Sequence, residues 1–316
     1  MTTTLTYDGL NRVKSKTYTD GTPPVTYQYY LSGDGDTTGT LRSVGNSAST
    51  TGYTHDKFGR ATANTQTTPT NGGTAYSFSY LVSLSDQVTN VNYPSGRSVT
   101  YGFDNADRVW TVAGKLSGAT TNYTASGQYI AYTAAGGFVT VPLGSGVTES
   151  YAWNDRLQQI GIGAKKVSPA LTLLALNFYP CDTGLTACPN NNGNIWRETV
   201  QNTNLTTAVT QEYRYDALNR LTSAGEGSNW SRAFSYDPYG NMYLSTLPPS
   251  GPPVDPTTPV GSGWIDSTRN RLVNPGVGIG YDNAGNMTSI NGSNWSYDAE
   301  NRLKSSTLGG NTTTYA

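Results

Sequence analysis

The sequence has little charge, one histidine, two cysteines and no long apolar run. Charged residues make up 13% of its 316 residues, about half the fraction usual in soluble domains. The formal net charge of −1 provides no field that would attract nucleic acid. The most apolar stretch, residues 170–179, is too short to span a bilayer, and the first residues lack the cationic and apolar segments of a signal peptide. We therefore expect no nucleic-acid partner and no membrane insertion by this segment.

Tyrosine, threonine, glycine and proline are abundant instead. The chain has 23 Tyr against 6 Phe, with 36 Gly and 16 Pro. Tyr and Thr favour half-buried strands, and Gly and Pro favour turns. Residues 76–80 (YSFSY) and 98–103 (SVTYGF) alternate with the period of a strand. This composition predicts an all-β chain with almost no helix, in which hairpins stack side by side into a continuous curved sheet, because a lone hairpin is unstable in water.

A seven-residue word recurs nine times along the chain. It consists of an aromatic residue, Asp, two variable residues, one of Asn, Gly or Asp, then Arg or Asn, and an apolar residue. The first four copies stand about 48 residues apart, which leaves room for degenerate copies, and residues 94–101 are interpreted as one. The nine copies begin at Tyr7, His55, Phe103, Tyr151, Tyr215, Tyr236, Asp266, Tyr281 and Tyr297.

Each column of the word suits a hairpin turn. Asp at the first position of a type I turn accepts hydrogen bonds from the backbone that follows it. Asn, Gly and Asp tolerate positive φ at the least cost, and a type I turn followed by a left-handed residue joins two strands through a bulge. We therefore predict structural turn residues at Asp8, Asn11, Asp56, Gly59, Asp104, Asp107, Asp216, Asn219, Asp237, Gly240, Asp282, Gly285, Asp298 and Asn301.

Two copies of the word depart from its Asp column. The copy at 151–157 has Ala152 in that column and Asp155 in the column of positive φ. The copy at 266–272 has Ser267 and Asn270 in the same places. The word alignment predicts that Asp155 and Asn270 are the left-handed residues of these turns.

We expect residues 1–316 to form a single repeat array with two interruptions. Residues 247–263 carry six prolines, which cannot donate to a ladder, and so predict a loop between hairpins. Residues 179–194 form the second loop and contain Cys181 and Cys188. A disulfide between them would close an eight-residue loop, and two free thiols are the alternative. The spacing does not match a zinc pair.

The words YDALNRL (215–221), YDPYGNM (236–242), YDNAGNM (281–287) and YDAENRL (297–303) resemble the YD repeats of the RHS (rearrangement hot spot) family. These repeats are shared with the shell component of insecticidal Tc toxin complexes and with teneurins. The resemblance covers most of the chain and is most specific from 211 to 308. It implies a spiralling sheet of hairpins that curls into a shell, as part of a longer, secreted or surface-displayed bacterial protein. In polymorphic toxins of the family, the shell encloses a C-terminal toxin domain.

No residue is assigned to catalysis, to a cofactor or to a metal. His55 stands in the aromatic column, where a packed ring is favoured over a catalytic base. Residues 34–39 are similar to the start of a calcium loop but lack the acidic twelfth position, so a hairpin loop is favoured.

The leading hypothesis is therefore a structural module, not an enzyme: a part of a β-shell that encloses or displays a toxin or effector domain not present in this chain. Its partner would be the remainder of the longer polypeptide. The alternative is an extracellular module that binds glycans or a cell-surface partner, with Trp230, Trp264 and Trp295 as stacking platforms.

Overall fold

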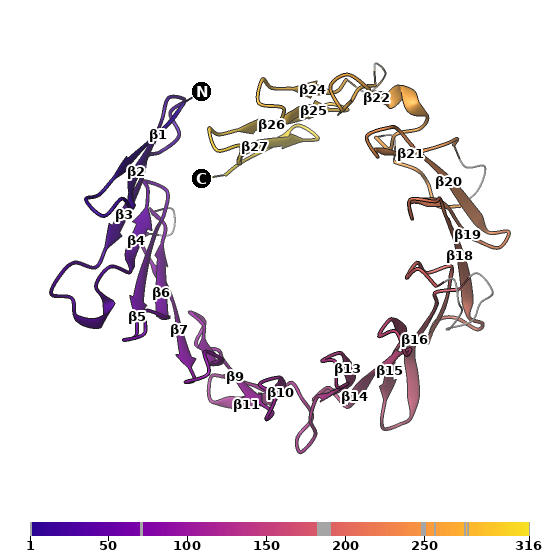
Figure 1. Cartoon of the computed structure of the whole chain (residues 1–316), viewed down its shortest axis with the longest axis horizontal. Helices are drawn as coiled ribbons and strands as arrows, with labels where there is room; N and C mark the ends of the chain where they lie inside the picture. The colour runs from indigo at the N-terminus through magenta and orange to yellow at the C-terminus, as the bar shows by residue number, and fades with distance from the viewer. Residues whose placement is uncertain are drawn as a thin grey trace. The chain divides into compact units, whose positions relative to one another are not determined.

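The all-β prediction is confirmed. The computed structural model describes residues 2–69, 72–181, 191–247, 251–255, 257–274, 276 and 278–315. Across these residues the chain forms strands β1 to β28 and two short 3-10 turns, η1 (Gly35–Thr37) and η3 (Ser262–Trp264), and no α-helix (Figure 1).

The first sheet has eleven strands, and each strand pairs antiparallel with the next one along the chain. This sequential order is the simplest outcome of hairpins that are added one after another. Its strands are β1 (Thr3–Tyr7), β2 (Val13–Tyr18), β3 (Val25–Tyr29), β4 (Leu41–Gly45), β5 (Thr50–His55), β6 (Ala61–Thr67), β7 (Ala75–Val82), β8 (Val88–Asn92), β9 (Ser98–Phe103), β10 (Val109–Leu116) and β11 (Ala119–Asn122).

The second sheet has ten strands in the same sequential order. Its longest strand, β16, contains most of the apolar stretch of residues 170–179. The strands are β12 (Ala131–Tyr132), β13 (Phe138–Pro142), β14 (Val147–Trp153), β15 (Gln159–Lys166), β16 (Leu171–Tyr179), β17 (Arg197–Asn202), β18 (Val209–Tyr215), β19 (Leu221–Glu226), β20 (Trp230–Tyr236) and β21 (Met242–Leu244).

Two smaller sheets follow, so the hydrogen-bonded array is interrupted where one continuous sheet was expected. The interruption after β21 comes at the proline-rich residues 247–263. Proline has no N–H to donate to a ladder, which accounts for the interruption there. One sheet contains β22 (Ile265–Asp266) and β23 (Arg271–Leu272), and the other contains β24 (Gly280–Tyr281), β25 (Met287–Ile290), β26 (Ser293–Tyr297), β27 (Leu303–Leu308) and β28 (Asn311–Thr314).

The chain divides into two compact units, which are described separately. The first contains Met1–Asn122, Tyr281–Thr288 and Ser293–Ala316, and the second contains Tyr123–Gly280 and Ser289–Gly292.

Few side chains are fully buried. A two-layer β domain buries one face of each sheet. Here the buried apolar residues of the described chain are Val99, Ile130, Cys181, Ala224 and Leu244, and most inward positions along the strands are only half-buried. Strand ladders, cross-strand contacts and turns therefore have to carry much of the stability that a packed core would otherwise supply.

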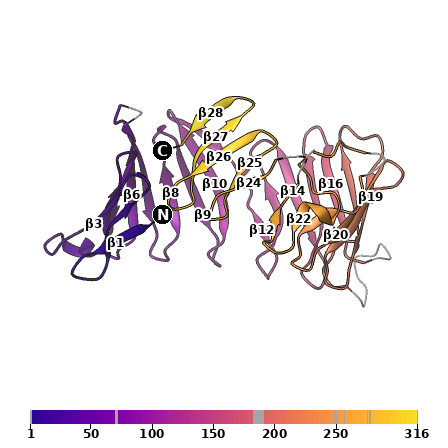
Figure 2. The same cartoon turned by 90° about the horizontal axis from the view of Figure 1, so that it is seen from above.

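The sequential order fixes where the turns lie. Because neighbouring strands are antiparallel, connections alternate between the two edges of a sheet (Figure 2). In the eleven-stranded sheet, the connections that follow β1, β3, β5, β7 and β9 all lie at the same end of the strands. We call this end of the sheet the word edge. The words beginning at Tyr7, His55 and Phe103 all lie on it.

Candidate functional site

The turn between β1 and β2 shows the geometry of one word. The amide of Asp8 donates to the carbonyl oxygen of Arg12 at 2.9 Å, and the amide of Asn11 donates to the carbonyl oxygen of Asp8 at 3.0 Å. The carboxylate oxygen Oδ1 of Asp8 accepts from the amides of Leu10 and Arg12 at 2.9 and 3.0 Å. The strand register shifts at Thr6/Tyr7, where the bulge begins. The carboxylate thus accepts from two backbone amides of the turn, and two other amides donate to backbone carbonyl oxygens.

In five words the arginine donates to this same carboxylate. Arg12 donates from Nε to Asp8 Oδ2 at 2.7 Å, and its second nitrogen lies 2.6 Å from that oxygen. Such charge-assisted contacts are among the stronger hydrogen bonds in proteins. The same pair recurs at Asp56–Arg60, Asp104–Arg108, Asp216–Arg220 and Asp298–Arg302.

Where asparagine replaces arginine, its amide takes over the contact. Nδ2 of Asn241 donates to Oδ2 of Asp237 at 2.8 Å, and Nδ2 of Asn286 donates to Oδ2 of Asp282 at 2.9 Å. The turn therefore needs a donor at this position and not a charge.

These hydrogen bonds lower the pKa of the word carboxylates. At Asp56 the side-chain hydrogen bond from Arg60 is the largest cause, and burial opposes it. At Asp8 the backbone amide of Arg12 contributes most to lowering the pKa. The pKa is lowered in the same way at Asp104, Asp216, Asp237 and Asp282. At Asp298 burial raises the pKa, but the hydrogen bonds from Arg302 outweigh it. Ionised and fully engaged, these carboxylates are poor candidates for proton transfer.

The fourth residue of each turn has positive φ, the conformation that Asn and Gly adopt at the least cost. The φ values are 60° at Asn11, 76° at Gly59, 60° at Asp107, 62° at Asn219, 89° at Gly240, 96° at Gly285 and 60° at Asn301.

The sequence alignment was wrong for one word and incomplete for another. In the turn after β14, Asn154 replaces Asp: its amide donates to the carbonyl oxygen of Gln158 at 3.0 Å. Leu157, with φ 60°, is the left-handed residue in place of Asp155. In the turn after β22, Asn270 has φ 52°, but Asp266 and not Ser267 accepts from the turn backbone.

Four further turns have the same backbone hydrogen bonds without the word. Ser, Tyr, Thr or Leu stands in the Asp column, so the side-chain signal is weak. Only the positive-φ column keeps its residue types, with Asp86, Gly96, Gly136 and Gly146. The turns are Ser83–Gln87, Tyr93–Arg97, Thr133–Gly137 and Leu143–Val147. The second of them overlaps the degenerate copy expected at 94–101.

Arginines also connect one turn to the next along the word edge. Nη1 of Arg12 donates at 3.0 Å to the carbonyl oxygen of Gly39, in the next connection of that edge. Nη1 of Arg60 lies 2.7 Å from both the carbonyl oxygen of Ser83 and the carboxylate of Asp86. Each of these arginines therefore holds its own turn and the following one.

Asparagines form similar connections elsewhere. In the first unit, Nδ2 of Asn286 donates to Oδ1 of Asn301 at 2.8 Å. In the second unit, Oδ1 of Asn219 accepts from Asn192 and Asn194 at 2.8 and 3.0 Å. These bonds again join a turn to the neighbouring connection.

A tyrosine at the end of a strand, whether or not it opens a word, binds the strand before it. The hydroxyl of Tyr29 donates to the carbonyl oxygen of Val13 at 3.1 Å, and that of Tyr297 donates to the carbonyl oxygen of Met287 at 3.0 Å. The acceptor in each case directly follows the Arg or Asn of the preceding word. Because phenylalanine could not make this bond, the pattern accounts for part of the excess of Tyr over Phe.

The other candidate residues have structural surroundings. The His55 ring packs edge-on against Tyr30, and its Nδ1 lies 3.2 Å from the Thr40 hydroxyl. Cys181 is buried and disulfide-bonded. Cys188 lies outside the described residues, so their pairing stays a prediction. Across the described chain, no group of three or more His, Cys, Asp or Glu side chains is placed to hold a metal ion.

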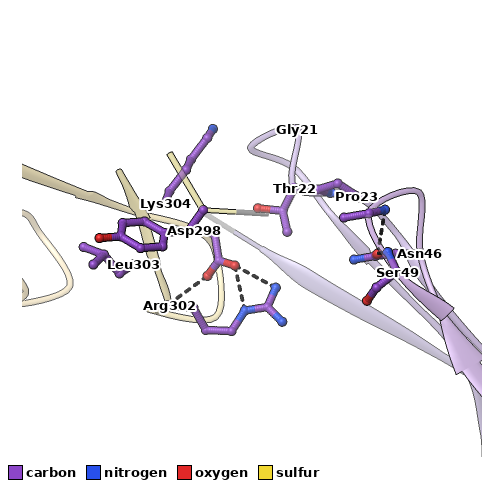
Figure 3. Close-up of a pocket in the computed structure, with 11 residues that line it drawn as sticks. Gly21, Thr22, Pro23, Asn46, Ser49, Asp298, Arg302, Leu303 and Lys304 are labelled. Atoms are coloured by element: carbon purple, nitrogen blue, oxygen red, sulfur yellow. Dashed lines mark hydrogen bonds and ion pairs between the residues drawn. The ribbon is translucent and has the colours of Figure 1, made fainter. Parts of the chain in front are cut away.

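The first unit contains a cavity of about 400 Å³ between its N-terminal loops and the turn of Asp298 (Figure 3). Asp298 and Arg302 line one wall, and Thr22 and Ser49 line the opposite wall. Both oxygens of Asp298 already accept hydrogen bonds from its own turn. A 2.9 Å ion pair between Lys16 and Glu300 connects the same two segments. The cavity therefore lies at a joint between hairpins, and its carboxylate is not free.

In the described ranges, no helix has the length and apolar character needed to cross a membrane.

No protein-family model matches the chain, and no curated protein matches its sequence. Solved structures do. A chain of the crystal structure of TcdB2-TccC3-Cdc42 matches 97% of this chain with a TM-score of 0.77 at 15% sequence identity. The chain has the fold of these Tc toxin chains. The Photorhabdus luminescens Tc holotoxin pore matches with a TM-score of 0.75 over 97% of the chain at 15% identity. The structure of TcdB2-TccC3 matches with 0.67 over 99% at 14% identity.

The likeness to Tc toxin shell chains expected from the words is thus confirmed as a likeness of fold. The matched region is 17% of the first two solved chains and 19% of the third, so this chain spans less than a fifth of their length.

Proposed function

We propose that this chain is a structural module of an RHS-type β-shell, which encloses or displays a toxin or effector domain of a longer polypeptide. The observation that carries the proposal is the use of the word residues: their carboxylates, arginines and asparagines are bound to their own turn and to the neighbouring one. A site for substrate turnover needs groups that remain available to a substrate, and these groups are engaged in holding hairpins together.

The likeness to Tc toxin chains supports the same function, because it extends over nearly the whole of this chain. In this proposal the module catalyses no reaction, its partner is the remainder of its own polypeptide, and the assembled protein is secreted or displayed on a bacterial surface. A sheet of hairpins linked edge to edge suits a wall, since each added hairpin buries the edge of the one before it.

Limited proteolysis of the full-length polypeptide tests this function. We expect a domain outside the repeat array to resist trypsin under native conditions. It should become sensitive when two words are disrupted by Asp56→Ala with Arg60→Ala and Asp216→Ala with Arg220→Ala. The control is Asp155→Ala with Lys57→Ala, since neither side chain makes the hydrogen bonds that hold a word turn together. A full-length protein in which no domain is protected would contradict the enclosing shell. Specific binding of the isolated chain on a glycan panel would favour the binding-module hypothesis.

A further inference from the structure

The word edge of the first sheet carries a row of exposed apolar side chains at its turn tips. Leu10 is 74% exposed, Leu31 67%, Phe58 62% and Leu84 92%. They belong to the four consecutive connections after β1, β3, β5 and β7, which share one edge. Leu10 and Phe58 are the third residues of their turns and Leu84 is the second, while Leu31 stands at the start of the longer connection 30–40. We call them the apolar tip row.

The turn geometry does not require apolar residues at these positions. The backbone of a word is held by its Asp, its left-handed residue and its Arg, and the tip side chain takes no part in these hydrogen bonds. The equivalent positions of other words hold Ala106, Ala284 and Glu300 as well as Leu218 and Tyr239, so the turn accepts both small or polar and large apolar residues there. On the opposite edge, the described tips at 20–24, 46–49, 93–97 and 117–118 carry no exposed large apolar residue. Among the described turn residues of this sheet, the exposed large apolar side chains therefore lie on the word edge, and a row of this kind indicates an interaction surface.

We propose that the apolar tip row docks an amphipathic α-helix of a protein partner. The first reason is spacing. Neighbouring strands are about 4.8 Å apart, so every second connection repeats at about 9.6 Å. Residues seven apart in an α-helix repeat at about 10.5 Å on one face, whereas alternate residues of a strand repeat at about 6.8 Å. Four tips span about 29 Å, which corresponds to a helix of about 20 residues.

Charge and area favour the same occupant. Asp8 is paired with Arg12, and Arg60 with both Asp56 and Asp86, within the turns, while the ammonium group of Lys57 lies 5.1 Å from the centroid of the Phe58 ring. The row therefore lacks the cluster of unpaired cations that recruits a protein to anionic lipid. The four side chains offer about 500 Å² of apolar surface. A stable dimer needs about 800 Å² from each partner, so a single helix fits the row better than a second copy of this chain.

A designed peptide serves as the probe. It has 21 residues, with Leu at the first and fourth positions of each heptad, Lys and Glu elsewhere, and a fluorescent label. Its control has the same composition in scrambled order. The variant L10S/L31S/F58S/L84S removes the row. The variant L5S/L116S/L308S is the control, because these leucines are also exposed, at 40%, 50% and 53%, but do not belong to the connections of the word edge.

In fluorescence anisotropy, the patterned peptide should bind the wild type and the L5S/L116S/L308S variant equally, and the row variant at least tenfold more weakly. The scrambled peptide should also bind at least tenfold more weakly. Circular dichroism should show the same strand signal in all three proteins, because the substituted side chains are exposed in both variants. Absence of peptide binding, or equal binding by the row variant, would overturn the proposal. So would row-dependent binding to neutral phosphatidylcholine vesicles, or a row-dependent dimer in sedimentation, without peptide binding. The proposal does not depend on what the full-length protein encloses.

Discussion

The hydroxyl group of Tyr236 donates a 2.8 Å hydrogen bond to the carbonyl oxygen of Leu221, the residue that follows Arg220 of the preceding word. The Tyr236 ring also lies under the guanidinium group of Arg220, whose central carbon is 4.4 Å from the ring centroid. One tyrosine therefore binds the preceding word through both its polar and its apolar parts.

Tyr236→Phe should lower the free energy of unfolding by about 1 kcal/mol, because the carbonyl of Leu221 loses a donor while the ring still stacks. Urea denaturation measures the change. Tyr239→Phe is the control, since Tyr239 is 62% exposed at the tip of the same word and should shift the midpoint very little. Equal effects of the two substitutions would mean that the tyrosine column is selected for its ring alone.

Substitutions at Asn11 test whether the fifth position of the word is selected for its positive φ. Its φ is 60°, so Asn11→Val should destabilise the chain by about 1–2 kcal/mol, the usual cost of placing a β-branched residue there. Asn11→Gly should be close to wild type, because Gly59 fills the same column at φ 76°. Urea midpoints rank the variants. If valine is tolerated while glycine destabilises, positive φ is not the reason that Asn, Gly and Asp occupy this position of the word.

The same substitution should behave differently at Asn219. From the sequence columns alone, Asn219→Gly is expected to be neutral. Because Oδ1 of Asn219 accepts from both Asn192 and Asn194, we now expect a loss of about 1 kcal/mol. The sequence identifies which residue types suit the turn, but it does not show which neighbouring connection comes within hydrogen-bond reach.

The stability of the array should fall at acid pH. The pKa of Asp56 is lowered from 3.8 in the folded chain. Its ionised carboxylate therefore makes its full contribution to the free energy of unfolding when the pH is above the pKa of the unfolded state. The contribution is then lost as the pH falls through the lower native value. The variant D8N/D56N/D104N should therefore melt below the wild type at pH 7, with a difference that shrinks toward pH 2. Thermal melts across this range measure it. D155N, outside the acceptor column, should follow the wild type. A difference that is constant with pH would contradict the role of the carboxylates.

The disulfide is tested by alkylation. If Cys181 pairs with Cys188, iodoacetamide should label neither cysteine of the unfolded chain until a reductant is added, and both thereafter. Mass spectrometry counts the labels. Reduction should lower the free energy of unfolding by about 2–3 kcal/mol, the chain-entropy value for an eight-residue loop. Labelling without reductant would support the free thiols.

Composition and alternation were enough to predict the fold class, because Tyr, Thr and Gly in these numbers suit hairpins and little else. The word was aligned wrongly at 151–157 because leucine is an unexpected left-handed residue, and Asn154 with Gln158 replaces the usual Asp and Arg. The turn at Thr133–Gly137 was missed because only its backbone follows the pattern. The interruption between β11 and β12 could not be predicted, since residues 123–130 contain no proline.

The central claim is that the words act as joints between neighbouring hairpins, and a double-mutant cycle across one joint tests it most directly. Asn286 and Asn301 belong to successive words and share a 2.8 Å hydrogen bond. Asn286→Ala removes the donor, and Asn301→Gly removes the acceptor while it preserves the left-handed backbone. Urea unfolding of the two single variants and the double variant gives the coupling energy. We expect the double variant to be less destabilised than the sum of the single variants by about 0.5–1 kcal/mol. Effects that add within about 0.3 kcal/mol would show that the two turns are independent, and would contradict the account.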